Sequence, residues 1–213
     1  MKSPLGIQLI KFKKKSLSGS SKRWLQRQHN DELVIKAKKL GYRSRAVFKL
    51  EEINQKLKIL KQNDVILDLG SSPGSWSQFL RKKGYDNIIA VDILEMEKID
   101  KVHFIFGDFT EDDTQEQIRK IYKNVDVILS DIAANTTGNK KLDSFKTNSV
   151  CLEVLDFAYK FLGKNGRVLC KFFNGELDKD IILFSKVNFK KNKIIKPSSS
   201  RKDSKENYIY CEI

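Results

Sequence analysis

The stretch DVILDLGSSPGSWSQFL, residues 64–80, decides the fold predicted for this chain. It opens with the short apolar run DVILDLG, which is typical of a strand buried on both faces. Glycines at Gly70 and Gly74 then permit a tight turn, and a helix is predicted from Trp76 to Lys83. The segment is therefore a strand, a turn that lets a ligand approach the backbone closely, and a helix.

The same alternation of apolar run and helix continues along the chain. Further strands are predicted at 87–93, 102–109, 125–131, 166–173, 187–195 and 207–213, and further helices at 31–40, from Ser44 onward, and at 112–122, 144–162 and 176–186. Short apolar strands separated by helices indicate βαβ units. The predicted fold class is α/β, with a mostly parallel sheet that helices cover on both faces.

Polar residues gather where the predicted strands end, namely Asp92, Asp108, Asp131 and Lys171. Ligands of open parallel sheets bind outside the carboxyl ends of the strands. Asp92, about twenty residues beyond the glycine turn, is placed to accept hydrogen bonds from ribose hydroxyls, and Asp108 is placed to contact a base. Either acid alone is more often a loop cap. Together with the turn they favour an adenosine-type ligand, whereas the GxxxG spacing gives little support to a dinucleotide site.

The charge is polarised along the chain. The formal net charge is +14 at pH 7. Residues 1–62 carry +13 (17 basic, 4 acidic), residues 63–185 carry −4 (16 and 20), and residues 186–213 carry +5 (8 and 3). A genome that favours lysine codons would enrich lysine along the whole chain. The net negative charge of residues 63–185 therefore argues that such a compositional bias does not explain the basic ends by itself. Two basic ends indicate a polyanionic partner such as a nucleic acid.

Length and composition exclude several classes of protein. The 213 residues, with 40% apolar and 32% charged, are enough for a buried core, and no apolar run approaches a membrane span. The three cysteines and two histidines show no metal-ligand spacing, so neither a disulfide framework nor a metal site is expected. We expect a flexible basic arm over 1–23 and one domain over 24–213, with N-terminal helices within 24–62.

At this point the sequence resembles the FtsJ-type ribose 2′-O-methyltransferases. The motifs that carry the resemblance are SRAVFKLEEI (44–53), DLGSSPGSWSQ (68–78), VDILEM (91–96), GDF (107–109), SDIAANTTG (130–138), KFFNGE (171–176) and KPSSSRKDSKENYI (196–209). They follow in order over roughly residues 22–213. Ser75 stands where a glycine is usual and Ala134 where a proline is usual; both departures concern loop rigidity.

The resemblance implies a Rossmann-like fold with a seven-stranded, mostly parallel sheet, and S-adenosyl-L-methionine as the cofactor. It implies a catalytic tetrad of Lys49, Asp131, Lys171 and Glu206. The implied cofactor-binding residues are Gly70, Gly74, Trp76, Asp92, Asp108 and Asp131. The substrate implied is a uridine ribose in 23S ribosomal RNA, within the large (50S) subunit of the ribosome.

The chemistry fits these residue types. A ribose hydroxyl is a poor nucleophile at neutral pH, so the enzyme must align it with the methyl group and accept its proton. A lysine accepts a proton only when burial or a second lysine makes its ammonium more acidic. We assign this role to Lys171, oriented by Asp131, with Lys49 and Glu206 completing the hydrogen bonds. Taken alone, Lys49 and Glu206 read as solvated surface residues, but Lys171 follows a buried strand and must be paired or functional.

Alternatives remain open at this stage. They are the same reaction on the ribose of a tRNA anticodon loop, a non-catalytic RNA-binding assembly factor, and, less favoured, a nicotinamide-dependent oxidoreductase. The basic ends are expected to meet around the catalytic face and bind phosphates, which positions an RNA without reading its sequence. We expect a monomer in the cytoplasm of a bacterium; an organellar form is the alternative because the first thirty residues lack acids.

Overall fold

The computed structural model describes residues 31–134, 137–201 and 203–213, so the predicted arm over 1–23 lies outside the described residues. Its centre is a seven-stranded sheet in the order β3-β2-β1-β4-β5-β7-β6. The strands are β1 (Ile66–Leu69), β2 (Ile88–Asp92), β3 (Val102–Phe106), β4 (Val125–Ser130), β5 (Leu162–Phe173), β6 (Lys191–Ile195) and β7 (Glu206–Glu212). Strand β7 runs antiparallel to both its neighbours, and the pairs from β3 to β5 are parallel. The predicted α/β fold is confirmed.

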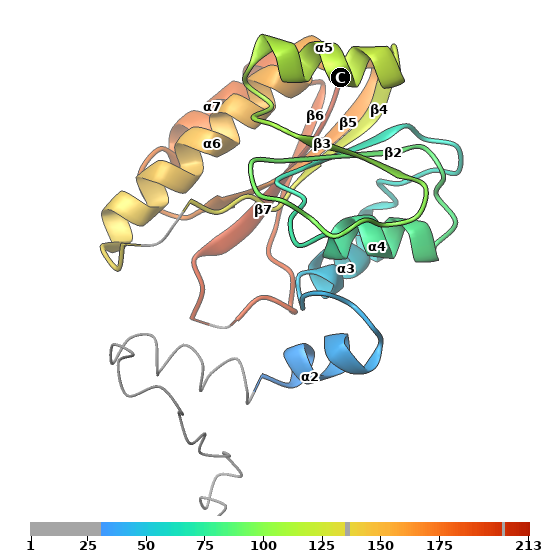
Figure 1. Ribbon diagram of the computed structural model, residues 1–213. Coiled ribbons are helices and arrows are strands. Elements are labelled where there is room, and N and C mark those ends of the chain that lie inside the picture. Colours follow the sequence, from blue (N-terminus) through green and yellow to red (C-terminus); the bar gives the residue numbers. More distant parts are fainter. Residues whose placement is uncertain (1–30, 135–136, 202) are drawn as a thin grey trace, which may run out of the picture.

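Helices cover both faces of the sheet (Figure 1). They are α2 (Glu32–Lys39), α3 (Val47–Leu57), α4 (Ser75–Lys82), α5 (Asp112–Ile121), α6 (Lys140–Phe161) and α7 (Asp178–Asn188). One apolar cluster joins residues of α5, α6 and α7 to one face, and a second joins residues of α2, α3 and α4 to the other. Since side chains alternate along a strand, residues two apart on one strand share a face.

Three elements, α6, β6 and β5, begin four residues away from their predicted starts, and other boundaries shift by less; β5 begins at Leu162 rather than at 166. Helix α6 begins at Lys140 rather than 144, because the Asn139 side chain accepts hydrogen bonds from the backbone N–H groups of Lys141 and Leu142. Strand β6 is shorter than predicted, since the polypeptide after α7 joins the sheet only from Lys191. Within the described residues, no helix is both long and apolar enough to cross a membrane.

The strand order places a site at the carboxyl ends of the central strands. The chain builds outward from β1 to β3, then returns to place β4 on the other side of β1. The connections diverge at the carboxyl ends of β1 and β4, which leaves a crevice there. The glycine turn, Asp92 and Asp131 all lie at these carboxyl ends, as the sequence predicted.

Candidate active site

A cavity of about 590 Å³ opens at the carboxyl ends of β1 to β4. It is lined by Gly70, Ser72, Val91, Asp92, Ile93, Leu94, Gly107, Asp108, Phe109, Asp131, Ile132, Ala133, Ala134, Val150 and Glu153. Apolar walls with a few carboxylates suit a ligand that combines a flat apolar ring with hydroxyl, amino or cationic groups. Asp92, Asp108 and Asp131 are thereby brought together from three separate strand ends.

The two turn glycines are needed for different reasons. Gly70 has φ +70°, and a Cβ there would lie 2.1 Å from Cγ1 of Ile132, a residue of the cavity wall. Gly74 has φ +102° and begins α4, and a Cβ there would lie 2.8 Å from Nη1 of Arg43. The Arg43 guanidinium donates to the carbonyl oxygens of Pro73 and Glu97, both at 2.8 Å. Gly70 therefore shapes the cavity, whereas Gly74, which does not line it, lets Arg43 hold two loops together.

Both predicted acids act as loop caps and line the cavity as well. Asp92 accepts hydrogen bonds from the backbone N–H groups of Ser72 and Leu94, each at 2.8 Å. Asp108 accepts from the backbone N–H of Thr110 at 2.9 Å and from its hydroxyl at 2.8 Å. A carboxylate has about four acceptor positions, so each acid keeps capacity for a ligand donor. The caps fix where those free positions point.

Four side chains from distant parts of the chain meet beside the cavity. Lys171 on β5 lies 3.1 Å from Asp131, which follows β4, and also donates to the backbone carbonyl of Asp131. Lys49 on α3 lies 2.7 Å from Oε2 of Glu206 and 3.8 Å from Oδ1 of Asp131. Two ammonium groups and two carboxylates thus form one continuous cluster, the four residues predicted as a tetrad.

The cluster is largely buried, but each side chain keeps a small exposed fraction. The exposed fraction of the side chain is 17% for Asp131, 12% for Lys49, 10% for Glu206 and 6% for Lys171. A substrate can therefore reach the two carboxylates and Lys49 more readily than Lys171. Burial tends to raise the pKa of Asp131, but the ammonium groups of Lys171 and Lys49 outweigh it and lower that pKa below its usual value. Asp131 is therefore a carboxylate at neutral pH and a fixed acceptor for both lysines.

Comparison with known proteins agrees with this geometry. The model of the FtsJ-like methyltransferase family matches residues 42–213. The chain belongs to this family. The Pelagibacter ubique protein named "Ribosomal RNA large subunit methyltransferase E" is 42% identical over 91% of this chain and 96% of its own length. A Rickettsia akari protein of the same name is 42% identical over 89% of this chain and 87% of its own length. The chain is a methyltransferase.

Solved structures support the fold of this methyltransferase. A Plasmodium falciparum protein described as a ribosomal RNA methyltransferase matches with a TM-score of 0.72 and 32% identity, over 80% of this chain and 97% of that one. A Lactococcus lactis protein titled as a hemolysin matches with a TM-score of 0.57 at 18% identity, over 80% of this chain and 88% of that one. The second likeness concerns the fold alone.

Sequence reasoning missed Tyr208. This residue of β7 is fully buried, and its hydroxyl donates to Oδ1 of Asp131. Lys49 Nζ lies 5.9 Å from its ring centroid. Tyr208 lies directly opposite Lys171 in the antiparallel pair β5–β7. The sequence alone does not show this, because it does not give the register of the two strands.

Trp76 contacts the protein core rather than the cavity. It is 3% exposed and does not line the cavity, and its indole N–H donates to the carbonyl of Ala46 at 2.9 Å. Its ring centroid lies 6.2 Å from that of Tyr208. In this structure Trp76 therefore joins the start of α3, which carries Lys49, to the tyrosine beneath Asp131. The resemblance assigned Trp76 to cofactor binding, but Trp76 is not among the residues that line the cavity.

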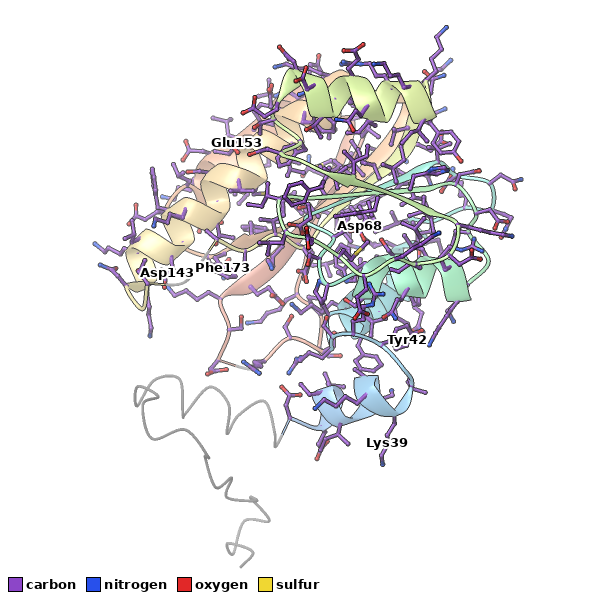
Figure 2. The ribbon with its side chains drawn as sticks, in the orientation of Figure 1. Lys39, Tyr42, Asp68, Asp143, Glu153 and Phe173 are labelled. Carbon is purple, nitrogen blue, oxygen red and sulfur yellow. The ribbon has the colours of Figure 1, made fainter. Side chains whose placement is uncertain are left out.

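Two further carboxyl groups were not predicted. Burial, with the nearby carboxylates of Asp131 and Asp92, raises the pKa of Asp68 to about 7, against the lowering effect of a hydrogen bond from Ser77 at 2.7 Å. Asp68 lies at the centre of the molecule in Figure 2. Glu153, labelled on α6 in the same figure, lines the cavity, and burial together with Asp108 raises its pKa. The motif DLG offered a signal for Asp68; nothing in the local sequence singled out Glu153.

Proposed function

We propose that this protein uses S-adenosyl-L-methionine to methylate the 2′-hydroxyl of a uridine ribose in the 23S RNA of the large ribosomal subunit. The observation that carries the proposal is the cluster of Lys49, Asp131, Lys171 and Glu206 at the rim of a cavity with ligand-facing carboxylates. The names of its relatives, which cover nearly the whole chain, supply the class of RNA.

The cavity fits the proposed cofactor by the chemistry of its acceptor groups and apolar walls. Carboxylates of Asp92 and Asp108 suit ribose hydroxyls and an adenine amino group, and Ile93 and Leu94 supply apolar surface for the ring. Asp131 faces the same cavity with its negative charge and suits the cationic end of the molecule. When bound there, the cofactor supplies an electrophilic methyl group on a sulfonium.

The protein's own contribution is alignment and proton handling. Lys171 is held by Asp131 through two oxygens, the carbonyl and Oδ1, which fixes its Nζ atom. We assign to the neutral amine of Lys171, formed when its ammonium releases one proton to solvent, the acceptance of the proton that the ribose hydroxyl loses as it attacks. Lys49, fixed by Glu206, is the second hydrogen-bond partner of that hydroxyl. Positioning of this kind supplies much of the acceleration of a group transfer.

The basic surface supports an RNA partner. Lys36, Lys38 and Lys39 are exposed near the end of α2. Asp31, at the start of this helix, pairs with Arg45 and lies 3.2 Å from Arg201 of the segment 196–205 that precedes β7. The described part of the N-terminal basic region thus contacts the C-terminal basic region, beside the segment that leads into Glu206. Lysines there would bind phosphates of a folded RNA without reading its sequence.

A methylation assay tests the proposal. Purified protein with a labelled methyl donor is given unmethylated large ribosomal subunits, free 23S RNA and tRNA, and the product is mapped by its resistance to alkaline cleavage. The proposal predicts label on the ribose of one uridine in large-subunit RNA. Label on tRNA would instead favour the anticodon-loop alternative, and an unlabelled set would favour a non-catalytic assembly factor. Monomeric state and cytoplasmic location belong to the same proposal and are read from sedimentation and cell fractionation.

A further inference from the structure

Three consecutive serines before β7 have different surroundings. Ser198 is exposed and donates its backbone N–H to Oε1 of Glu52 at 2.8 Å. Ser199 donates both its backbone N–H and its hydroxyl to Oε2 of the same glutamate, each at 3.0 Å. Ser200 is 8% exposed and turns inward, where its hydroxyl donates to Oε1 of Glu206 at 2.6 Å. Only Ser200 of these three touches the catalytic cluster.

The carboxylate of Glu206 has a separate partner on each oxygen. Oε2 accepts from Lys49 Nζ at 2.7 Å, and Oε1 accepts from Ser200. A carboxylate held by a single contact can rotate about its last torsion, which is a soft one. The second contact fixes the plane of the group, so that Oε2 faces Lys49 and holds its ammonium 3.8 Å from Asp131.

The backbone around Ser200 is itself anchored to α3 and to the start of α2. Glu52 is partly buried, which opposes ionisation, but hydrogen bonds from Lys56, Ser198 and Ser199 lower its pKa to about 2. Arg45 donates to the carbonyl oxygen of Ser199. Arg201, the next residue after Ser200, pairs with Asp31. These contacts hold the turn in place from both sides, so the Ser200 hydroxyl is presented at a fixed position.

We propose that Ser200 is a positioning residue for methyl transfer, which orients Glu206 and, through it, Lys49. This inference rests on the proposed function, because it assumes that Lys49 and Glu206 act on the ribose hydroxyl. Ser200 itself contacts neither ribose nor cofactor. Its removal therefore slows the transfer step and leaves the binding of both substrates as it was.

The first test compares Ser200→Ala with Ser198→Ala, a matched control two residues away on the same segment. Because hydrogen bonds to charged groups are stronger than neutral ones, Ser200→Ala is expected to lower kcat about tenfold, with KM for RNA and the dissociation constant of the cofactor within about twofold of wild type. Ser198→Ala is expected to keep the wild-type rate. Ser200→Thr, which keeps the hydroxyl, is expected to recover most of the loss, and melting temperatures of all three verify folding.

A double-mutant cycle with Glu206→Gln separates positioning from a structural role. If Ser200 acts through Glu206, adding Ser200→Ala to Glu206→Gln causes little further loss of kcat. An equal, independent loss in that background, or an unchanged kcat in Ser200→Ala alone beside an impaired Glu206→Gln, would overturn this inference and leave the proposed function standing. A full rate in Glu206→Gln would overturn the catalytic assignment of Glu206 itself, and the inference with it.

Discussion

Strand β5 carries two buried cations on the same face, and only one of them belongs to the candidate site. Arg167 and Lys171 are each 5% exposed, and each pairs with a carboxylate. Arg167 lies 2.7 Å from Asp64 and also donates to the carbonyl of Ile59, at the end of the sheet away from the cavity. Lys171 lies at the carboxyl end, beside Asp131 and within a cluster of four charges. Burial and pairing are common to both.

The difference lies in what each cation can do. The guanidinium of Arg167 is permanently charged and spreads its donors over fixed acceptors, which suits a structural pair. The ammonium of Lys171 can lose and regain a proton, and its partner Asp131 lines a cavity. A charged residue within a buried strand therefore indicates either a structural ion pair or a functional group. Its position relative to the carboxyl ends of the strands distinguishes the two.

The largest expected effect is the loss of transfer in Lys171→Met. Without a proton acceptor, kcat is expected to fall by about a thousandfold or more, as general-base catalysis and alignment are lost together. Binding of the cofactor, measured by calorimetry, is expected to stay near wild type. Lys164→Met, on an exposed position of the same strand, is the control and should keep full activity. Retained transfer in Lys171→Met would remove the distinction drawn between the two cations.

Arg167→Leu is expected to affect stability instead. It leaves the Asp64 carboxylate buried without its partner, and breaking a buried pair in this way costs about 3–5 kcal/mol of unfolding free energy. The double variant Arg167→Leu with Asp64→Leu is expected to recover much of that loss, measured by urea denaturation. Protein that remains folded should keep the wild-type kcat; a rate loss as large as that of Lys171→Met would show that the two ends of β5 are coupled.

Two tyrosines of β7 allow the same comparison between a residue of the candidate site and one outside it, with a smaller expected effect on kcat. Tyr208 donates to Asp131 and Tyr210 donates to Glu212, two residues apart on the same face. Tyr208→Phe removes one hydrogen bond from a charged acceptor, so kcat is expected to fall about three- to tenfold. Tyr210→Phe is the matched control, expected to leave kcat unchanged. Equal rates in the two variants would mean that Asp131 is positioned by its lysines alone.

The smallest effect concerns Asp68, on the same sheet face as these groups. Its pKa of about 7 in the folded protein lies above the ordinary value of 3.8, so the folded state binds more protons between these values. The stability that this protonated carboxyl contributes is present at low pH and is lost as the pH rises through about 7. Asp68→Asn does not titrate, so its stability relative to wild type is expected to rise by of the order of 1 kcal/mol from about pH 6 to about pH 8, read from urea midpoints. A difference that does not change with pH would contradict the raised pKa.

Some of the site was accessible to sequence reasoning because its signals are local. The strand, turn and helix around Gly70 follow from apolar runs and glycines, and the strand-end acids Asp92 and Asp108 follow from position alone. By contrast, Lys49 and Glu206 read as surface residues until the family resemblance was considered. Their pairing at 2.7 Å joins positions 157 residues apart, which no local pattern encodes.

Other parts depended on register and packing. Tyr208 faces Lys171 because β5 and β7 pair antiparallel in one register, and a shift of one residue would turn the tyrosine to the opposite face. Ser200 is the one of three adjacent serines whose hydroxyl reaches Glu206, while Glu52 and Arg45 hold the turn through Ser198 and Ser199. Trp76 packs against Tyr208 because α4 covers the face of the sheet on which the Tyr208 side chain lies.

The sequence by itself therefore determined the α/β class, the order of strands and helices along the chain, the glycine turn, the strand-end acids and the separation of charge. These depend on the period of apolar residues and on backbone preferences, which act over a few residues. Only the tertiary structure decided which charges meet, which of two buried cations pairs with a carboxylate that lines the cavity, and which serine reaches Glu206. Those outcomes depend on strand order, register and helix packing, which bring together groups that the chain keeps far apart.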